Sequence, residues 1–450
     1  MSEQIGSITI YDPSMAEKVA DMFNAFNEIW PGGFGGAIPF DAQRVHDWLD
    51  KTSAVADLIA LDENEEPIGY CGLYPHWRDE NAAYISIIGV HPLVLGKKFG
   101  KRLLLKSLEV AVENGITRVD LHTWSGNMEA MPLYKKVGLV WVPETAVYMQ
   151  DFIPGLLQFP LAKEWFAKHP DWYGCFKKEL VQAPDKEIVD NMEVYTYKFE
   201  VGEDKLIAEI DRYGWGISSI EKQLNGKKIS VKSRISAHEI FMGIQNSMTI
   251  TIVNNTGENI STPLEVEPFA GLEWIEDFPS TIEIKNGETV TVTKDFIVNK
   301  KAKAFETNQK GSEVIKTSLR FEDQDIQLIT GGKIQETVKL STFTPYQIVP
   351  LGNEIRLYMD IFNNTKINLN GQVEYMIEGL FESKQINEFS LAAEEITGLY
   401  IPIKMPEMVK NPVFTLQANS KIEINGKMFE MPEYNLPIIA DVDNLVELVK

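Results

Sequence analysis

The chain has 450 residues, of which 44% are hydrophobic and 24% charged, and its formal net charge at pH 7 is −22. This length exceeds what a single compact core supports, so we expect several globular domains. The acidic balance argues against nucleic acid and anionic membranes as partners, because binding to phosphates requires a concentrated basic face. A neutral or cationic partner agrees better with this charge.

The sequence further indicates a soluble cytoplasmic protein. No apolar run reaches the roughly 18 residues that a membrane helix requires, and residues 1–11 lack the pattern of a signal peptide. Cys71 and Cys175, the two cysteines, lie far apart in the sequence. Neither a disulfide framework nor a metal site is therefore predicted, and both thiols are expected to be free.

Residues 7–150 alternate between strand-like and helix-like segments. Asp12-Pro13 predicts a helix start, and the glycine-rich residues 30–36 predict an irregular loop after that helix. The acidic turn at 62–67 predicts a hairpin. The expected helices are residues 12–29, 41–49, 99–114 and 128–137. The expected strands are residues 7–11, 56–61, 68–73, 83–90, 119–123, 139–142 and 146–148.

After residue 153 the pattern changes. Residues 153–191 combine four prolines with short helical pieces and many aromatic side chains, which predicts a partly helical connector that packs against its neighbours. From about residue 192 onward the segments are short and strand-like, with Asn, Gly or Pro between them. The strands at 193–201 and 206–210, with a turn at Asn225-Gly226, either join the following β-structure or form a small separate sheet.

An internal repeat lies within this β-rich part. Residues 237–256 and 346–365 superpose without a gap at an offset of 109 residues, and both segments end in Asn-Asn-Thr. Each Asn-Asn-Thr predicts a tight turn, since Asn tolerates a left-handed backbone and bonds to its own chain. Further matches pair 282–298 with 389–405, and 319–334 (with Gly331-Gly332) with 416–429 (with Asn425-Gly426). Two units of roughly 105 residues are typical of immunoglobulin-like sandwiches.

A strand, a glycine-containing loop and a helix start follow one another in residues 87–101. Free amides at a helix N-terminus bind anions such as a pyrophosphate, and Gly96 and Gly100 permit close approach. The alternative is an ordinary strand-to-helix turn in which the glycines only provide clearance. Lys97, Lys98 and Lys101 add positive charge, or form a solvated helix start.

The spacing of Val90, Pro92, Gly96 and Gly100 resembles the coenzyme A pyrophosphate motif of the GNAT acetyltransferases. The segment from Asn127 to residue 139 resembles that family's second motif, about 30 residues later, and the order of strands and helices in 7–150 agrees. The resemblance covers about the first third of the chain. At two positions the family pattern is not followed, because Leu95 replaces Arg or Gln and Lys98 replaces Gly.

This resemblance implies direct acyl transfer from acetyl-CoA to a primary amine, without a covalent enzyme intermediate. Backbone amides near Ile88 and Val90 would hold the thioester oxygen, and Tyr134 would protonate the leaving thiolate. Asn127 would bond to the pantetheine arm or to the helix start. Outside the two motifs, a Tyr at position 134 would be read as a core aromatic. The implied coenzyme site comprises Ile88, Gly89, Val90, Leu95, Gly96, Lys97, Lys98, Phe99, Gly100, Lys101 and Asn127.

The base that accepts the amine proton is not defined by the sequence. A water chain is one possibility, and the candidate side chains are Glu28, His76, His91 and His122. The acceptor is expected between the loop at 30–36 and residues 74–78, where Phe34 and Trp77 would stack on a sugar or cage an ammonium group. Ordinary packing is the alternative for both rings.

The sequence therefore predicts a multidomain α+β protein. It comprises an N-terminal GNAT α/β/α fold with a mixed central sheet (1–152), a helical connector (153–191) and two all-β immunoglobulin-like sandwiches (192–342 and 343–450). The expected function is acetyl transfer to a small-molecule amine, with the sandwiches as binding or assembly modules. The alternatives are a non-catalytic sensor of coenzyme A or amine, and a protein that acts through its sandwiches on a carbohydrate, a protein partner or a second copy of itself.

Overall fold

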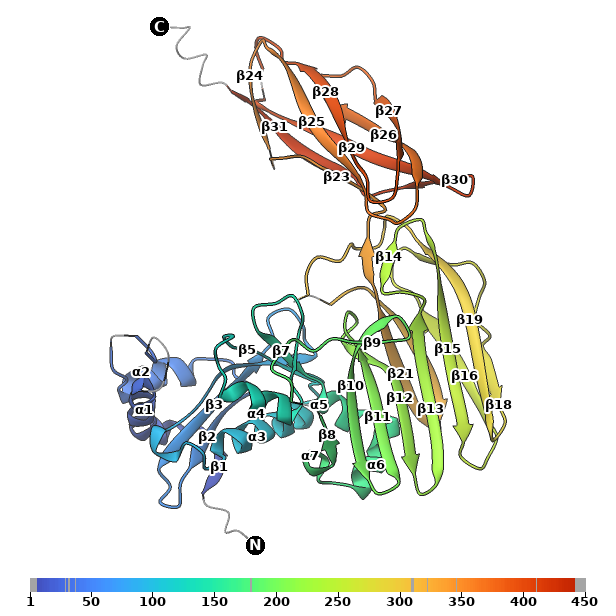
Figure 1. Ribbon diagram of the computed structural model, residues 1–450. Coiled ribbons are helices and arrows are strands. Elements are labelled where there is room, and N and C mark those ends of the chain that lie inside the picture. The colour runs from blue at the N-terminus through green and yellow to red at the C-terminus, as the bar shows by residue number, and fades with distance from the viewer. Residues whose placement is uncertain are drawn as a thin grey trace.

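The computed structural model describes residues 6–441 except 29, 31–32, 37, 179, 309–310, 322, 345 and 410. Figure 1 shows an N-terminal part with helices on a sheet, a larger β-rich part beside it, and a last β-rich part that extends away from both. Within the described residues, no helix is long and apolar enough to cross a membrane.

The N-terminal part is built on a seven-stranded sheet in the order β1-β2-β3-β4-β5-β7-β6. The pair β4–β5 is parallel and the other pairs are antiparallel, so the central sheet is mixed, as predicted. Its strands are β1 (Ser7–Ile10), β2 (Ala56–Leu61), β3 (Pro67–Pro75), β4 (Ala82–Val90), β5 (Arg118–His122), β6 (Val140–Trp141) and β7 (Tyr148–Asp151).

Helices cover both faces of this sheet. Ile59 and Leu61 pack with α1 and α2 on one face, whereas Leu58 and Ala60 pack with α3 on the other, because successive strand residues point to opposite sides. The helices are α1 (Ala16–Ala25), α2 (Ala42–Val45), α3 (Phe99–Glu113) and α4 (Ala130–Val137). Single turns flank them at η1 (Pro13–Met15), η2 (Phe26–Glu28), η3 (His46–Asp50) and η4 (Pro92–Val94).

The expected elements of this part are present, and one of them is displaced. Asp12 caps the first turn by accepting the Ser14 amide, as predicted. The last strand was expected at 146–148, but β7 begins at Tyr148. Thr145 accepts the Tyr148 amide and donates to the Val142 carbonyl, so the turn before the strand is longer than the apolar pattern indicated.

The connector is partly helical and packed, as expected. Trp165 is fully buried, and its ring centroid lies 6.0 Å from that of Phe199 on the following sheet. The connector contains α5 (Ile153–Gln158), α6 (Pro160–Lys168), α7 (Trp172–Cys175), β8 (Phe176–Lys177) and β9 (Glu187–Val189).

The first β-rich part contains a nine-stranded and a four-stranded sheet. Strands β10 and β11 belong to the same sheet as β15 and β19, which decides between the two arrangements left open above: they extend the sandwich. The large sheet contains β8, β9, β10 (Met192–Val201), β11 (Asp204–Asp211), β12 (Gly216–Leu224), β13 (Lys227–Ile235), β15 (Gln245–Asn255), β17 (Leu272–Trp274) and β19 (Glu288–Val298). The other sheets contain β16 (Ile260–Glu267), β18 (Thr281–Ile284), β20 (Val314–Phe321) and β21 (Gln324–Gly331), and the pair β14 (Glu239–Phe241) with β22 (Lys333–Gln335).

The last β-rich part repeats this plan in smaller form. In each copy an early strand pairs in parallel with a late one, β14 with β22 and β24 with β31. One sheet contains β23 (Val338–Ser341), β25 (Glu354–Asn363) and β28 (Ile396–Lys404). The other contains β24 (Gln347–Pro350), β26 (Leu369–Ile377), β27 (Gln385–Leu391), β29 (Val413–Ile424), β30 (Lys427–Glu430) and β31 (Tyr434–Asp441).

The two Asn-Asn-Thr turns make matching hydrogen bonds. The side chain of Asn254 donates to the Glu258 and Ile284 carbonyls, and that of Asn363 donates to the Ile367 and Ala392 carbonyls. In each copy the Thr two residues later donates to the Asn side-chain oxygen. The bonds to the own chain are confirmed, but the expected left-handed backbone is wrong, since neither Asn has a positive φ. The turn is stabilised instead by the hydrogen bonds of the buried Asn254 or Asn363 side chain.

One part of the repeat alignment is also wrong. Asn425 and Gly426 form a hairpin turn between β29 and β30, as their positive φ angles of 51° and 75° permit. Gly331 and Gly332 instead separate β21 from β22, which belong to different sheets. The hairpin that follows β20 turns at Asp323, with φ 63°, so this is the counterpart of Asn425-Gly426.

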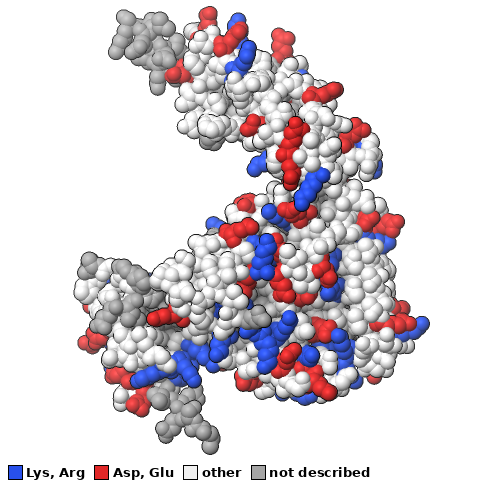
Figure 2. Space-filling view, in the orientation of Figure 1, with Lys and Arg blue, Asp and Glu red and all other residues white. Residues whose placement is uncertain are grey.

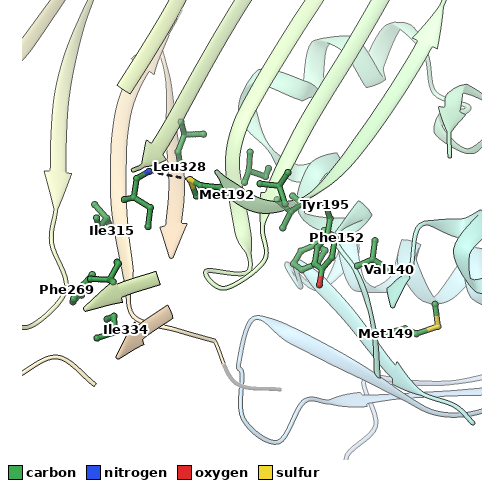
Figure 3. Close-up of a cluster of buried hydrophobic side chains, with 14 of the residues drawn as sticks. Val140, Met149, Phe152, Met192, Tyr195, Phe269, Ile315, Leu328 and Ile334 are labelled. Atoms are coloured by element: carbon green, nitrogen blue, oxygen red, sulfur yellow. Dashed lines mark hydrogen bonds between the residues drawn. The ribbon is translucent and has the colours of Figure 1, made fainter. Parts of the chain in front are cut away.

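A continuous apolar core joins the N-terminal sheet to the first sandwich. Figure 3 shows Val140 and Met149 on the sheet side, with Phe152 and Tyr195 between them and the sandwich residues. The rings of Phe152 and Tyr195 lie 6.1 Å apart, and Tyr197 donates from its hydroxyl to the Gly138 carbonyl at 2.8 Å. Apolar contact and a buried hydrogen bond thus hold the two parts together.

Asp151 at the end of β7 gives this junction a pH dependence. The carboxyl is fully buried, which raises its pKa to about 8, although it accepts the Ile153 amide at 2.9 Å. The folded state therefore binds a proton that the unfolded chain releases near pH 4. Stability is fully present below that pH and falls as the pH rises towards about 8. We expect Asp151→Asn to lessen this loss in urea-unfolding curves measured from pH 5 to pH 9; a wild-type slope in the variant would contradict the assignment.

Candidate active site

Strands β4 and β5 separate halfway along their length. They pair in parallel from Ala82–Arg118 to Ile85–Leu121, and β3 follows β4 from residue 83 to residue 90. A bulge in the β3–β4 ladder, between Gly72 and Leu73, lies at the point of separation. Within the described chain, residues 86–90 thus have strand neighbours on one side only, and an opening forms where the sheet would otherwise continue.

The amides of Ile88 and Val90 point into this opening. The His91 amide donates to the Ile68 carbonyl on β3, at 2.7 Å. Backbone groups alternate in direction along a strand, so the amides at 90 and 88 point away from β3. Two amides are therefore left free to bind an oxygen at the gap.

The N-terminus of α3 lies beside the same opening. Its first helical bond runs from the Arg102 amide to the Lys98 carbonyl, so the amides before it lack helical acceptors. Gly96 has a φ of 80° with open space around it, so its backbone conformation, rather than clearance, favours glycine. Lys98 adopts a φ of 67° where the family has Gly, and the left-handed form costs about 1 kcal/mol for such a residue.

Most of the predicted coenzyme-site residues surround one cavity of about 540 Å³, a volume typical of small-molecule sites. Lys97 and Asn127 do not line it. Asn127 donates to the Thr123 hydroxyl and accepts the Ala130 amide, so it braces the start of α4, one of its two expected roles. The lining includes Ile88, Gly89, Val90, Leu95, Gly96, Lys98, Phe99, Gly100, Lys101 and Tyr134.

Tyr134 is the one phenol that α4 contributes to this cavity. Its side chain is 6% exposed, and burial raises its pKa well above the ordinary value, with Cys71 adding to the shift. The hydroxyl is consequently protonated at neutral pH and able to donate. Tyr134 is therefore both a buried core aromatic, which was the alternative reading of the sequence, and a residue that lines the cavity.

The structure separates the candidate bases. His76 is buried, accepts the Arg78 amide through Nδ1 and lies 3.4 Å from the Tyr148 hydroxyl through Nε2. His91 caps η4 by accepting the Leu93 amide. Both rings are thus engaged in local structure, and the side chain of Glu28 lies outside the described part.

His122 differs from these candidates. It ends β5 at the point of separation, is exposed, and its Nδ1 lies 3.2 Å from the Tyr84 hydroxyl. Neighbouring rings shield part of the imidazole from water, which lowers its pKa below the ordinary value, and Asp120 partly opposes this. The ring is therefore neutral and able to accept a proton at pH 7. Because Leu121 packs with α3, His122 faces the opposite side of the sheet, towards α1 and α2.

The two aromatic residues expected at the acceptor have different environments. Phe34 is 4% exposed within a cluster of rings from α1 and the following loops, so stacking on an acceptor is excluded and ordinary packing is correct. Trp77 is 58% exposed, stacks on His76 at 4.3 Å and meets Tyr84 at 5.0 Å. Trp77 thus adjoins His122 through Tyr84.

Sequence reasoning missed two features near the site. Tyr173, from the connector, lines the cavity, and the Lys101 ammonium group lies 3.6 Å from the centre of its ring. Arg118 and Asp120 form a buried ion pair next to β4, with the Tyr148 hydroxyl donating to Asp120. The alternating charges in 118–120 were a signal for the pair, whereas nothing in the local sequence placed Tyr173 beside α3.

The family model of the acetyltransferase (GNAT) family matches residues 19–139. These residues form a GNAT domain. Acetyl-CoA is the cosubstrate of this family, and the cavity described above lies within the matched region apart from Tyr173.

Two curated relatives are named mycothiol acetyltransferase. The protein of Renibacterium salmoninarum is 27% identical over 107 residues, which cover 22% of this chain and 29% of the relative. That of Actinosynnema mirum is 27% identical over 133 residues, covering 28% of this chain and 42% of the relative. The chain thus spans less than half the length of either relative.

Solved structures match about a third of the chain. A GNAT acetyltransferase of Staphylococcus aureus is 18% identical with a TM-score of 0.27, covering 32% of this chain and 97% of its own. A GNAT N-acetyltransferase of Escherichia coli, solved in complex with CoA, is 16% identical with a TM-score of 0.24, covering 33% and 81% respectively.

Proposed function

We propose that the chain is an acetyl-CoA-dependent N-acetyltransferase that acts on a primary amine of a small molecule. The observation that carries this proposal is the cavity at the separation of β4 and β5, where free amides, the N-terminus of α3 and the Tyr134 hydroxyl converge. The names of the curated relatives support acetyl transfer. Acetyl-CoA would supply the activated acetyl group.

The residues around the cavity divide the chemistry between them. The amides of Ile88 and Val90 would hold the thioester oxygen as charge develops on it, and Tyr134 would protonate the departing sulfur. The free amides at the start of α3, together with Lys98 and Lys101, would bind the pyrophosphate. These groups fit the coenzyme, because a row of donors leads from the gap in the sheet to the helix end.

The acceptor would enter from the other face of the sheet. Tyr134 and the coenzyme cavity lie on the α3 side, whereas His122, Tyr84 and Trp77 lie on the side of α1 and α2. An amine bound there would meet the thioester through the gap between β4 and β5. We assign His122 as the base, since its neutral ring is exposed at that gap.

His122 gives the reaction a defined pH dependence. The base is active when neutral, so kcat/KM should fall as the pH drops through its pKa, which lies below the ordinary value. We expect His122→Gln to lower kcat/KM about 10²-fold and to remove this acid limb. Retention of the limb in the variant would show that another group, or a water chain, accepts the proton. His91→Gln is the matched control, because that ring only caps η4.

The reaction itself is tested by titrating the whole protein with acetyl-CoA in a calorimeter and by measuring thiol release over a panel of amines. Micromolar binding with amine-dependent release would support the transferase. Binding without release from any amine would favour the alternative, a sensor of coenzyme A or amine. Absence of binding would mean that Leu95 and Lys98 mark a lost coenzyme site.

The two β-sandwiches are proposed to be binding or assembly modules. The order of strands in each copy supports an immunoglobulin-like classification, with β25 and β28 in one sheet and β26, β29 and β31 in the other. Tyr358 and Tyr400 are exposed cross-strand partners with rings 4.8 Å apart at 68°. A tilted pair of this kind favours contact with a protein partner or second copy over a flat sugar platform. We further propose that the protein is cytoplasmic.

A further inference from the structure

The connector closes the outer side of the coenzyme cavity. Tyr173 of α7 lines that cavity together with Lys101 and Lys136. A smaller cavity of about 110 Å³ continues from it, shares Lys136 and Tyr173, and is lined further by Phe176 and Lys178. Tyr173, Phe176 and Lys178 lie beyond residue 139, where the family match ends. The extension of the cavity is therefore a feature of this chain and not of the matched domain.

Positive charge collects at this extension in a chain of net charge −22. Figure 2 shows Lys and Arg side chains gathered over the region of α3, α4 and α7. Within the described residues, the ammonium groups of Lys98, Lys101 and Lys136 have no carboxylate within 4.0 Å. Lys178 has Asp185 at 3.8 Å. Glu129 also lines the larger cavity, and Asp171 is the acid that raises the pKa of Lys101.

These lysines repel one another in the absence of an anion. Burial lowers the pKa of Lys101, and the charges of Lys136 and Lys98 lower it further. Burial is also the main cause of the lowered pKa of Lys178. A phosphate bound between these ammonium groups would offset their mutual repulsion, because an opposite charge favours the protonated form of each lysine.

Coenzyme A carries more negative charge than the start of α3 accounts for. Its pyrophosphate is matched by the free amides of that helix, but its ribose bears an additional 3′-phosphate with a charge of about −2 at neutral pH. We propose that Lys136 and Lys178 bind this 3′-phosphate. The ring of Tyr173 lies between the two phosphate sites and positions Lys101. This inference rests on the proposed use of acetyl-CoA.

The consequence is that the connector, and with it the first sandwich, takes part in coenzyme selection. Phe176 and Lys177 form β8, which pairs with β10 of the large sheet, so the position of Tyr173 and Lys178 depends on the sandwich. Two lysines that each form a charge-assisted bond to the phosphate are expected to favour CoA over 3′-dephospho-CoA by about 10- to 100-fold.

The test compares binding of CoA and 3′-dephospho-CoA to the full chain by calorimetry, in the wild type and in three variants. Lys136→Gln removes an exposed charge and is expected to weaken CoA binding about 10-fold while leaving dephospho-CoA within about twofold. Tyr173→Leu is expected to reduce the same preference. Lys177→Gln, on the outer side of β8, is the matched control and should bind like the wild type.

The outcomes separate this inference from the proposed function. If the wild type binds CoA without preference over dephospho-CoA, or if Lys136→Gln weakens both ligands equally, the 3′-phosphate site is refuted and the transferase proposal stands. If the wild type binds neither ligand, the proposed function fails, and this inference fails with it. A preference that disappears in Lys136→Gln and persists in Lys177→Gln supports the assignment.

Discussion

Tyr134→Phe is expected to lower kcat about 10²-fold or more while leaving the affinity for acetyl-CoA nearly unchanged. The ring keeps its packing beneath the cavity, because only the hydroxyl is removed from a side chain that is 6% exposed. The departing thiolate would then have to take its proton from water. Steady-state thiol release gives kcat, and calorimetry gives the dissociation constant of acetyl-CoA.

The raised pKa of Tyr134 sets a further expectation. Burial keeps the phenol protonated well above pH 10, so loss of this acid should not limit the wild-type rate in the alkaline range up to that pH. Full activity of the variant would show that another donor protonates the sulfur. Weaker binding of acetyl-CoA with unchanged kcat would instead make Tyr134 a binding residue.

Local sequence patterns were sufficient to predict the N-terminal sheet and the start of α3. The elements there follow short-range rules: Asp12 caps a turn, Gly115 has a φ of 72° after α3, and β2 is a short, nearly continuous apolar run of the kind that forms a buried strand. The internal repeat also came from sequence alone, because the buried Asn254 and Asn363 make matching hydrogen bonds and so restrict which residues fit.

Long-range contacts were not predictable in this way. Tyr173 reaches the coenzyme cavity because the connector folds back along α3, and no pattern within the connector indicates that direction. The choice of His122 over His76 and His91 likewise depends on tertiary contacts, since each of the three rings follows or ends a strand in the sequence.

The buried ion pair between Arg118 and Asp120 is the site of the largest expected change in stability. Asp120 is fully buried and accepts three hydrogen bonds from the Arg118 side chain, together with one from the Tyr148 hydroxyl. Arg118 also bonds to Asp79 at 2.7 Å and lies 4.0 Å above the ring of Trp215, in the turn between β11 and β12. The pair thus joins the active-site strands to the first sandwich.

Asp120→Ala is expected to destabilise the N-terminal part by about 3–5 kcal/mol, because it leaves the Arg118 guanidinium buried with one remaining carboxylate, that of Asp79. Replacing both partners, as Arg118→Met with Asp120→Leu, should recover much of this loss, since no charge is then left unpaired. Hydrogen exchange of the β4 and β5 amides, followed in urea, measures the local free energy of opening. Asp47→Ala, which removes an exposed partner of Lys51, is the control and should change little. Equal protection of β4 and β5 in the wild type and in Asp120→Ala would show that the pair contributes specificity of packing and not stability, as buried pairs do when their desolvation cancels their attraction.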